Sequence, residues 1–144
     1  MRTIKFRGKR CDNGEWVCGY YVECTETWKG GHPHKCWIVT SARSNGGFFA
    51  LQGRYPVQDH TIGQFTGLHD KNGNEIYEGD ILCYTDENQI TYYREVIYVD
   101  ACFAFSARID GKTLWSPLNM LFLDSWQIAG NIHDNPELMK GGQE

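Results

Sequence analysis

The twenty residues from Gly63 to Leu82 constrain the fold more than any other part of the chain. They read GQFTGLHDKNGNEIYEGDIL and place two turns and two short apolar runs in one stretch. Asn72-Gly73 is typical of a hairpin turn, and Gly79 can adopt the positive φ that swings a chain into a new strand. This density of turns predicts compact β-structure. No residue in the stretch has the spacing that a nucleophile, a general base or a metal cage requires.

The remaining segments show the same alternation of short strands and turns. Residues 4–10 and 15–24 flank Asn13-Gly14, which predicts a hairpin with a type I′ turn. Near the end of the chain, Asn135 as N-cap and Pro136 at the first helical position predict a short helix. Further strands are expected at 36–40, 48–51, 61–68, 75–77, 81–84, 90–99, 102–109, 112–115 and 126–132, with Asp110-Gly111 as another hairpin turn. The chain is therefore expected to be mostly β, as a sandwich or small barrel.

Length and charge narrow the classes of protein to consider. The 144 residues predict a single domain over 1–144, with a subdivision into 1–60 and 61–144 as the alternative. A net charge of −4 argues against a protein whose main affinity comes from neutralising phosphates. The densest basic cluster is expected to form an edge strand that its charge protects; it consists of Arg2, Lys5, Arg7, Lys9 and Arg10.

No apolar run approaches the roughly 20 residues of a membrane helix, and the first ten residues do not resemble a secretory signal. The protein is therefore expected in the cytoplasm, without a membrane partner. In that reducing compartment the six cysteines should be mostly thiols.

Two segments resemble metal sites at first reading. Asp70, Asn72 and Asn74 have the spacing of a calcium loop, but positions 6 and 12 of such a loop would be Glu75 and Ile81 instead of Gly and Glu. An ordinary turn is favoured there.

His32, His34 and Cys36 recur at every second residue, and Cys24 could supply a fourth zinc ligand. The spacing matches no recognised zinc finger, and a polar loop with solvated histidines is the competing interpretation. Both interpretations stay open, and no cofactor or metal is assigned.

No catalytic residue is assigned either, because no local signature such as G-x-S-x-G appears, so the chain is not expected to be an enzyme. A nucleic-acid platform is the serious alternative. It would combine Arg94 with aromatic side chains of two neighbouring strands, namely Tyr92, Tyr93, Phe103 and Phe105.

Three blocks of the sequence resemble the YopX family of phage and prophage proteins. They are Ile4-Lys5-Phe6-Arg7, then residues 61–81 with Thr61-Ile62-Gly63-Gln64-Phe65-Thr66-Gly67-Leu68, Asp70, Asn72-Gly73 and Ile76-Tyr77-Glu78-Gly79-Asp80-Ile81, and finally Gly130-Asn131-Ile132-His133-Asp134-Asn135-Pro136-Glu137-Leu138. Residues 25–56 carry little of the resemblance. The likeness implies a mostly β protein with an SH3-like barrel in the C-terminal half, beside the N-terminal β-hairpin region predicted above, and it implies self-association. It implies no active site, so we expect the motif residues to serve turns, loop caps and core. These residues are Gly63, Thr66, Gly67, Leu68, Asp70, Asn72, Gly73, Ile76, Tyr77, Glu78, Gly79, Asp80, Asn131, Asn135 and Pro136.

The sequence thus predicts a non-catalytic, cytoplasmic protein of a bacterial host cell, derived from a phage or prophage. It is expected to form a homo-oligomer and to bind a host or phage protein. The alternative is a small-barrel protein that binds single-stranded nucleic acid.

Overall fold

The computed structural model describes residues 1, 3–23, 36–45, 48–109 and 112–140. The chain divides into two compact units, Met1–Phe65 and Thr66–Glu144. Both are built almost entirely of antiparallel strands, so the mostly β prediction is confirmed. The described helices are 3-10 turns of three or four residues, none of them long and apolar enough to cross a membrane.

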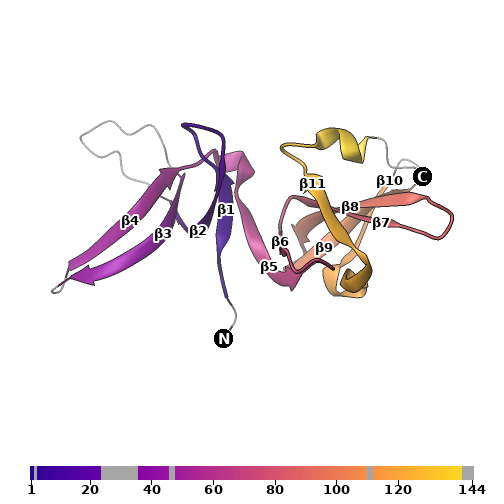
Figure 1. Cartoon of the computed structure of the whole chain (residues 1–144), viewed down its shortest axis with the longest axis horizontal. Helices are drawn as coiled ribbons and strands as arrows, with labels where there is room; N and C mark the ends of the chain where they lie inside the picture. The colour runs from indigo at the N-terminus through magenta and orange to yellow at the C-terminus, as the bar shows by residue number, and fades with distance from the viewer. Residues whose placement is uncertain (2, 24–35, 46–47, 110–111, 141–144) are drawn as a thin grey trace. The chain divides into compact units, whose positions relative to one another are not determined.

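The first unit contains most of a six-stranded antiparallel sheet with the strand order β4-β3-β2-β1-β5-β6 (Figure 1). Strand β6, which pairs with β5, belongs to the second unit. The core of the first unit lies on one face of the sheet, around the buried Cys36, Ile38 and Val57. Phe6 and Val17 pack against this cluster from neighbouring strands. The elements are β1 (Phe6–Lys9), β2 (Trp16–Glu23), β3 (Cys36–Asn45), β4 (Phe48–Pro56), η1 (Asp59–Thr61) and the first residues of β5 (Gly63–His69).

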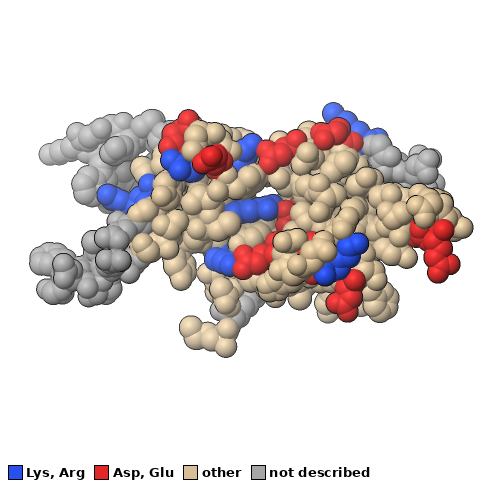
Figure 2. All heavy atoms as spheres, in the orientation of Figure 1, with Lys and Arg blue, Asp and Glu red and all other residues tan. Residues whose placement is uncertain are grey.

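Strand β1 lies in the interior of this sheet, so the prediction of a charged edge strand is wrong. Arg7 is opposite Cys18 of β2 on one side and opposite Gly63 of β5 on the other. Aromatic rings make the interior position tolerable for cations, since the Arg7 guanidinium lies 4.7 Å from the centroid of the Trp16 ring. Arg2 is outside the described residues. On the face drawn in Figure 2, several Lys and Arg side chains lie next to Asp and Glu side chains.

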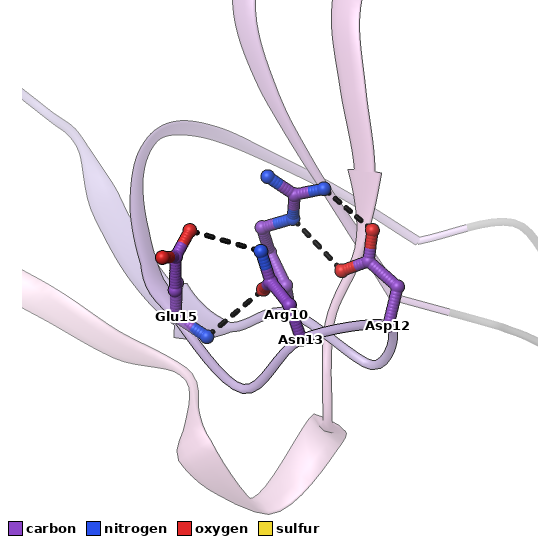
Figure 3. Close-up of polar contacts among 4 residues, drawn as sticks. All are labelled: Arg10, Asp12, Asn13 and Glu15. Atoms are coloured by element: carbon purple, nitrogen blue, oxygen red, sulfur yellow. Dashed lines mark hydrogen bonds and ion pairs between the residues drawn. The ribbon is translucent and has the colours of Figure 1, made fainter.

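The hairpin between β1 and β2 is confirmed, but its predicted turn type is wrong. A type I′ turn needs two consecutive residues with positive φ, and here Gly14 has a φ of 72° while Asn13 does not have a positive φ. The connection is a longer loop, in which the Gly14 N–H donates to the Arg10 carbonyl over 3.0 Å. The Asn13 side chain stabilises this loop by accepting the Glu15 N–H over 3.0 Å (Figure 3).

The second unit is built around a five-stranded antiparallel sheet with the order β10-β9-β8-β7-β11 (Figure 1). Its core contains Ile76, Leu82, Val96, Leu118 and Trp126. The elements after the shared strand β5 are β6 (Glu75–Tyr77), β7 (Asp80–Thr85), β8 (Thr91–Val99), β9 (Cys102–Ile109), β10 (Lys112–Pro117), η2 (Leu118–Met120), η3 (Leu123–Ser125), β11 (Gln127–Asn131) and η4 (Pro136–Met139).

The expected SH3-like barrel is not confirmed, because this sheet does not close within the described residues. Closure would require its two outer strands, β10 and β11, to pair with each other. The outer side of β11 is already occupied: the Ile128 N–H donates to the Asp70 carboxylate, and the Trp126 carbonyl accepts the Lys71 N–H. An open sheet is therefore the result.

The predicted short C-terminal helix is present only as η4, a single 3-10 turn. Pro136 does begin it, but the Asn135 side chain does not cap it. The Asn135 Oδ1 instead accepts the backbone N–H of Asn131 over 3.4 Å, so it is not available to the first turn. The predicted turn at Asp110-Gly111 lies outside the described residues.

Candidate functional site

Asp70 is the most heavily hydrogen-bonded of the motif residues. Its Oδ1 accepts the backbone N–H groups of Asn72 and Asn74, both over 2.9 Å. Its Oδ2 accepts the Asn74 side-chain amide over 3.2 Å and the Ile128 N–H over 3.0 Å. Burial alone would raise the pKa of Asp70, but these hydrogen bonds outweigh burial and hold the pKa below its usual value.

This arrangement matches a capped turn. Both Asp70 oxygens accept protein N–H groups, and Asn74 presents its amide nitrogen to the carboxylate instead of a ligand oxygen. The described residues contain no group of three or more His, Cys, Asp and Glu side chains that could hold a metal ion. Asp70 thus fixes the turn between β5 and β6 to strand β11.

Three glycines of the same block adopt a positive φ, Gly67 within β5 and the other two in turns. Gly67, Gly73 and Gly79 have φ values of 87°, 81° and 83°. At Gly79 this conformation lets the backbone bond in two directions, because its N–H donates to the Val96 carbonyl over 2.8 Å and its carbonyl accepts the Ile132 N–H over 2.9 Å. Gly79 therefore links the start of β7 to β8 and to the C-terminal segment.

The polar motif residues between these glycines bond to nearby backbone. The Thr66 hydroxyl donates to the Ile76 carbonyl over 2.8 Å and accepts the Leu68 N–H over 3.1 Å. The buried Asp80 accepts the Tyr77 N–H over 2.8 Å. Ile76 and Tyr77 are themselves buried, and Glu78 is half-buried between Tyr77 and Gly79.

The C-terminal motif forms a separate small turn. The Asn131 Oδ1 accepts the N–H groups of His133 and Asp134, over 3.0 and 2.9 Å. The Asn135 N–H then donates to the Asn131 carbonyl over 2.8 Å.

The remaining motif glycine lies in the first unit, where Gly63 is a buried residue of β5 opposite Arg7. The motif residues are thus distributed over several turns and do not converge on one cleft.

Of the candidate zinc ligands, only Cys36 lies within the described residues. It is buried in the core of the first unit, where its Sγ lies 3.5 Å from the Tyr21 hydroxyl. Cys24, His32 and His34 lie outside the described residues.

The aromatic platform proposed for nucleic acid is not assembled. Tyr92, Phe103 and Phe105 pack against the hydrophobic core of the second unit. Tyr93 points to the other face of the sheet, because successive strand residues alternate. Phe103 and Phe105 are thus partly buried against the core, and of the four rings Tyr92 is the one that lies beside the Arg94 guanidinium.

Arg94 and Glu95 are consecutive charged residues of β8, and both are half-buried. The sequence pattern pointed to Arg94 alone. Burial lowers the pKa of Arg94 and raises that of Glu95. The Glu95 carboxylate has no hydrogen bond or ion pair in the described part of the chain, and its neighbours across the sheet are Ile81 and Ser106. The sequence signal for Glu95 is an acidic residue inside an otherwise apolar strand.

We expect Glu95→Gln to raise the free energy of unfolding at pH 7 by less than about 1 kcal/mol, because the charged form is the one that burial penalises. Since the pKa is raised in the folded protein, wild type loses stability as pH rises through the folded pKa. The gain of the variant should therefore vanish below the unfolded pKa of about 4.3. Urea unfolding between about pH 3.5 and 7.5, a range that includes the unfolded pKa, measures this gain in stability. An equal gain at all pH values would contradict a raised pKa of Glu95.

Strand β10 is the most exposed strand of the second unit. It is an outer strand of its sheet and pairs only with β9 among the described strands. Leu114 is 51% exposed and Trp115 is 41% exposed. Met120 and Phe122, which follow in the chain, are also exposed. Sequence reasoning missed this strand as a site because exposure at a sheet edge depends on which strands become neighbours.

Comparison with known proteins supports one family. A model of the YopX protein family matches residues 5–140. The crystal structure of protein EF1440 from Enterococcus faecalis is similar over 96% of this chain and 99% of that one, with 27% identity and a TM-score of 0.55. The crystal structure of protein yopX from Bacillus subtilis is similar over 99% of this chain and 100% of that one, with 14% identity and a TM-score of 0.47. No curated protein matches. Because the family model covers nearly the whole sequence, the chain belongs to the YopX family.

Proposed function

We propose that this chain is a non-catalytic phage or prophage protein of the bacterial cytoplasm that acts by associating with itself and by binding a host or phage protein. The observation that carries the proposal is the open edge of strand β10 with exposed Leu114 and Trp115. An edge strand offers unpaired backbone groups to another chain, and apolar side chains beside them favour association. Single-stranded nucleic acid is not favoured, because Phe103 and Phe105 of the predicted aromatic platform pack against the core.

The direction of the backbone groups on β10 follows from the turn between β8 and β9. Asp100 and Ala101 have φ values of 48° and 61°, as in a type I′ hairpin, whose closing pair is hydrogen-bonded. That pair is Val99 and Cys102, so the Cys102 backbone groups point to β8. Along an antiparallel strand these groups alternate in direction, so the Ile109 groups point to β10.

Ile109 is opposite Lys112, so the backbone groups of Lys112 and of every second residue after it point to β9. The groups of Thr113, Trp115 and Pro117 point away from the sheet. Thr113 and Trp115 each present an N–H and a carbonyl, whereas Pro117 has no N–H to present. Thr113 and Trp115 are therefore the two residues of the open edge whose backbone can both donate and accept a hydrogen bond.

This pattern favours one register for pairing with a second copy. When a two-fold axis perpendicular to the sheet relates the two copies, the same face of both sheets lies on the same side. Two residues that pair across the interface therefore have their side chains on the same face. With the axis at Leu114, Thr113 meets Trp115 of the second copy, and Trp115 meets its Thr113. Each such pair exchanges two hydrogen bonds, so four form in total. With the axis at Trp115, four bonds could also form, but each Thr113 carbonyl would face Pro117, which has no N–H to donate, so both Thr113 carbonyls would stay without a donor.

We expect Thr113→Pro to prevent self-association while the sheet stays folded, because the Thr113 N–H points away from β9. The substitution removes two of the four hydrogen bonds, and we expect the dimer dissociation constant to rise at least about tenfold. The matched control is Leu114→Pro, which removes an N–H that points to β9 and should destabilise the chain instead. Sedimentation equilibrium gives the association constant, and urea unfolding gives the stability.

A wild-type chain that stays monomeric at several hundred micromolar, a concentration at which about 5 kcal/mol of association energy would be detected, would contradict the proposed self-association. A Thr113→Pro variant that dimerises like wild type would contradict the β10 interface but leave self-association through another surface.

A further inference from the structure

Arg94 lies on the core-facing side of strand β8 among aromatic rings. Its guanidinium carbon is 5.9 Å from the centroid of the Tyr92 ring and 5.8 Å from that of Trp126. Tyr84 connects the two rings, since its centroid lies 6.4 Å from that of Tyr92 in a stacked arrangement and 5.6 Å from that of Trp126. Residues of strands β7 and β8 and of the segment before β11 thus form the surroundings of this side chain.

The guanidinium uses little of its hydrogen-bonding capacity within the described residues. Its single hydrogen bond is donated by Nη1 to the Tyr93 carbonyl over 2.7 Å. A guanidinium has five N–H groups, so most of them still lack a protein acceptor. The aromatic contacts remove water from one side of the cation without supplying an acceptor there, and this burial lowers the pKa of Arg94.

No carboxylate compensates this half-buried charge in the described part of the chain. The nearest candidate through the ring contacts is Asp86, whose side chain is committed elsewhere. Its Oδ1 accepts the Asn88 and Ile90 N–H groups, both over 2.9 Å, and its Oδ2 accepts the Tyr92 hydroxyl over 3.2 Å. Arginines are almost never fully buried without a partner, and the unpaired N–H groups of this half-buried arginine are available to a ligand.

We propose that Arg94, flanked by Tyr84, Tyr92 and Trp126, binds the carboxylate of a ligand or partner whose apolar or planar part packs against the tyrosine rings. A carboxylate accepts two parallel N–H groups from one guanidinium, and arginine and aromatic side chains together form strong binding sites. The ring contacts fix the arginine before binding, which lowers the entropy lost on binding.

The charge of the second unit favours a carboxylate over a polyanion. Residues 66–144 contain five Lys and Arg against thirteen Asp and Glu, a net charge of −8. A nucleic-acid backbone would meet repeated repulsion from this unit, and a phosphate dianion twice that of a single carboxylate. The inference does not depend on self-association through β10.

The test uses the full chain and sodium benzoate, which combines a carboxylate with a planar apolar group. The Arg94 Nε–Hε and Trp126 indole signals are followed by NMR at constant ionic strength, with sodium acetate, inorganic phosphate and benzyl alcohol as separate arms. We expect saturable shifts with benzoate at roughly 1–10 mM, weaker binding of acetate, and no saturation with benzyl alcohol.

Arg94→Met should abolish benzoate binding, and Arg94→Lys should weaken it roughly tenfold, because lysine cannot form the paired contact. Arg54→Met is the matched control, since Arg54 is an exposed arginine of β4 in the first unit, and it should bind benzoate like wild type. No saturation up to about 50 mM benzoate, or unchanged binding in Arg94→Lys, would overturn the proposal. Phosphate binding tighter than benzoate would overturn its assignment to carboxylates.

Discussion

Replacing Asp70 with alanine is expected to lower the free energy of unfolding by about 3 kcal/mol. The substitution removes the acceptor of four hydrogen bonds, three of them from backbone N–H groups of Asn72, Asn74 and Ile128. Hydrogen bonds to a charged acceptor contribute more than neutral ones, and the Ile128 N–H would lose its partner on the outer side of β11. Urea unfolding followed by tryptophan fluorescence at pH 7 measures the loss.

The pH dependence of the stability distinguishes the contribution of the Asp70 charge from that of its packing. Because its folded pKa lies below the unfolded value of about 3.9, the ionised carboxylate contributes stability above that value, and the contribution is lost as pH falls through the folded pKa. The difference between wild type and Asp70→Ala should therefore shrink in acid. Asp124→Ala, at an exposed aspartate of η3, should change the stability by less than about 0.5 kcal/mol. A loss of stability no larger for Asp70→Ala than for Asp124→Ala would contradict the role of Asp70 in fixing this turn to β11.

Replacing Gly19 with alanine is expected to lower the free energy of unfolding of the first unit by on the order of 3 kcal/mol. A Cβ at this position would overlap with the Val39 carbonyl oxygen and would lie 3.1 Å from the Ile38 side chain. The obstructing atom belongs to backbone, so no rotamer change can relieve the overlap, and β2 and β3 would have to separate. Urea unfolding with the signal of Trp16 or Trp37 reports on this unit.

Gly14→Ala is the matched control for this substitution. Gly14 has a positive φ, but a Cβ there meets nothing within 4 Å, so only the backbone conformation is penalised, by about 1 kcal/mol. A Gly19→Ala variant as stable as Gly14→Ala would show that the two strands can move apart freely, against the close approach in the structure.

Local patterns were sufficient to find most strands. The predicted ranges 75–77 and 102–109 coincide with β6 and β9, since each is a β-prone run bounded by turn residues. The turn between β8 and β9 shows the limit of such patterns. Asp100 and Ala101 adopt positive φ without a glycine or an asparagine, because pairing of the two long strands imposes the conformation.

Long-range features were less accessible from the sequence. The bond from the Ile128 N–H to Asp70 joins residues 58 positions apart, so no spacing rule could predict it. The same holds for β1, whose charged residues suggested an edge until both of its neighbours were known. The candidate sites share this origin: Arg94 lacks an ion-pair partner among the described residues, and β10 lacks a second strand, only because of how distant segments assemble.

The two borders of the second unit's sheet differ in what they allow. Residues 70–71 cover β11, while β10 stays uncovered among the described strands. A sheet with two uncovered borders can add molecules without end, which is the geometry of a fibre. With only one, addition through that sheet stops once two molecules have met. For the pairing proposed at β10, the bonds to Asp70 and Lys71 thus leave no second border for further addition through this sheet.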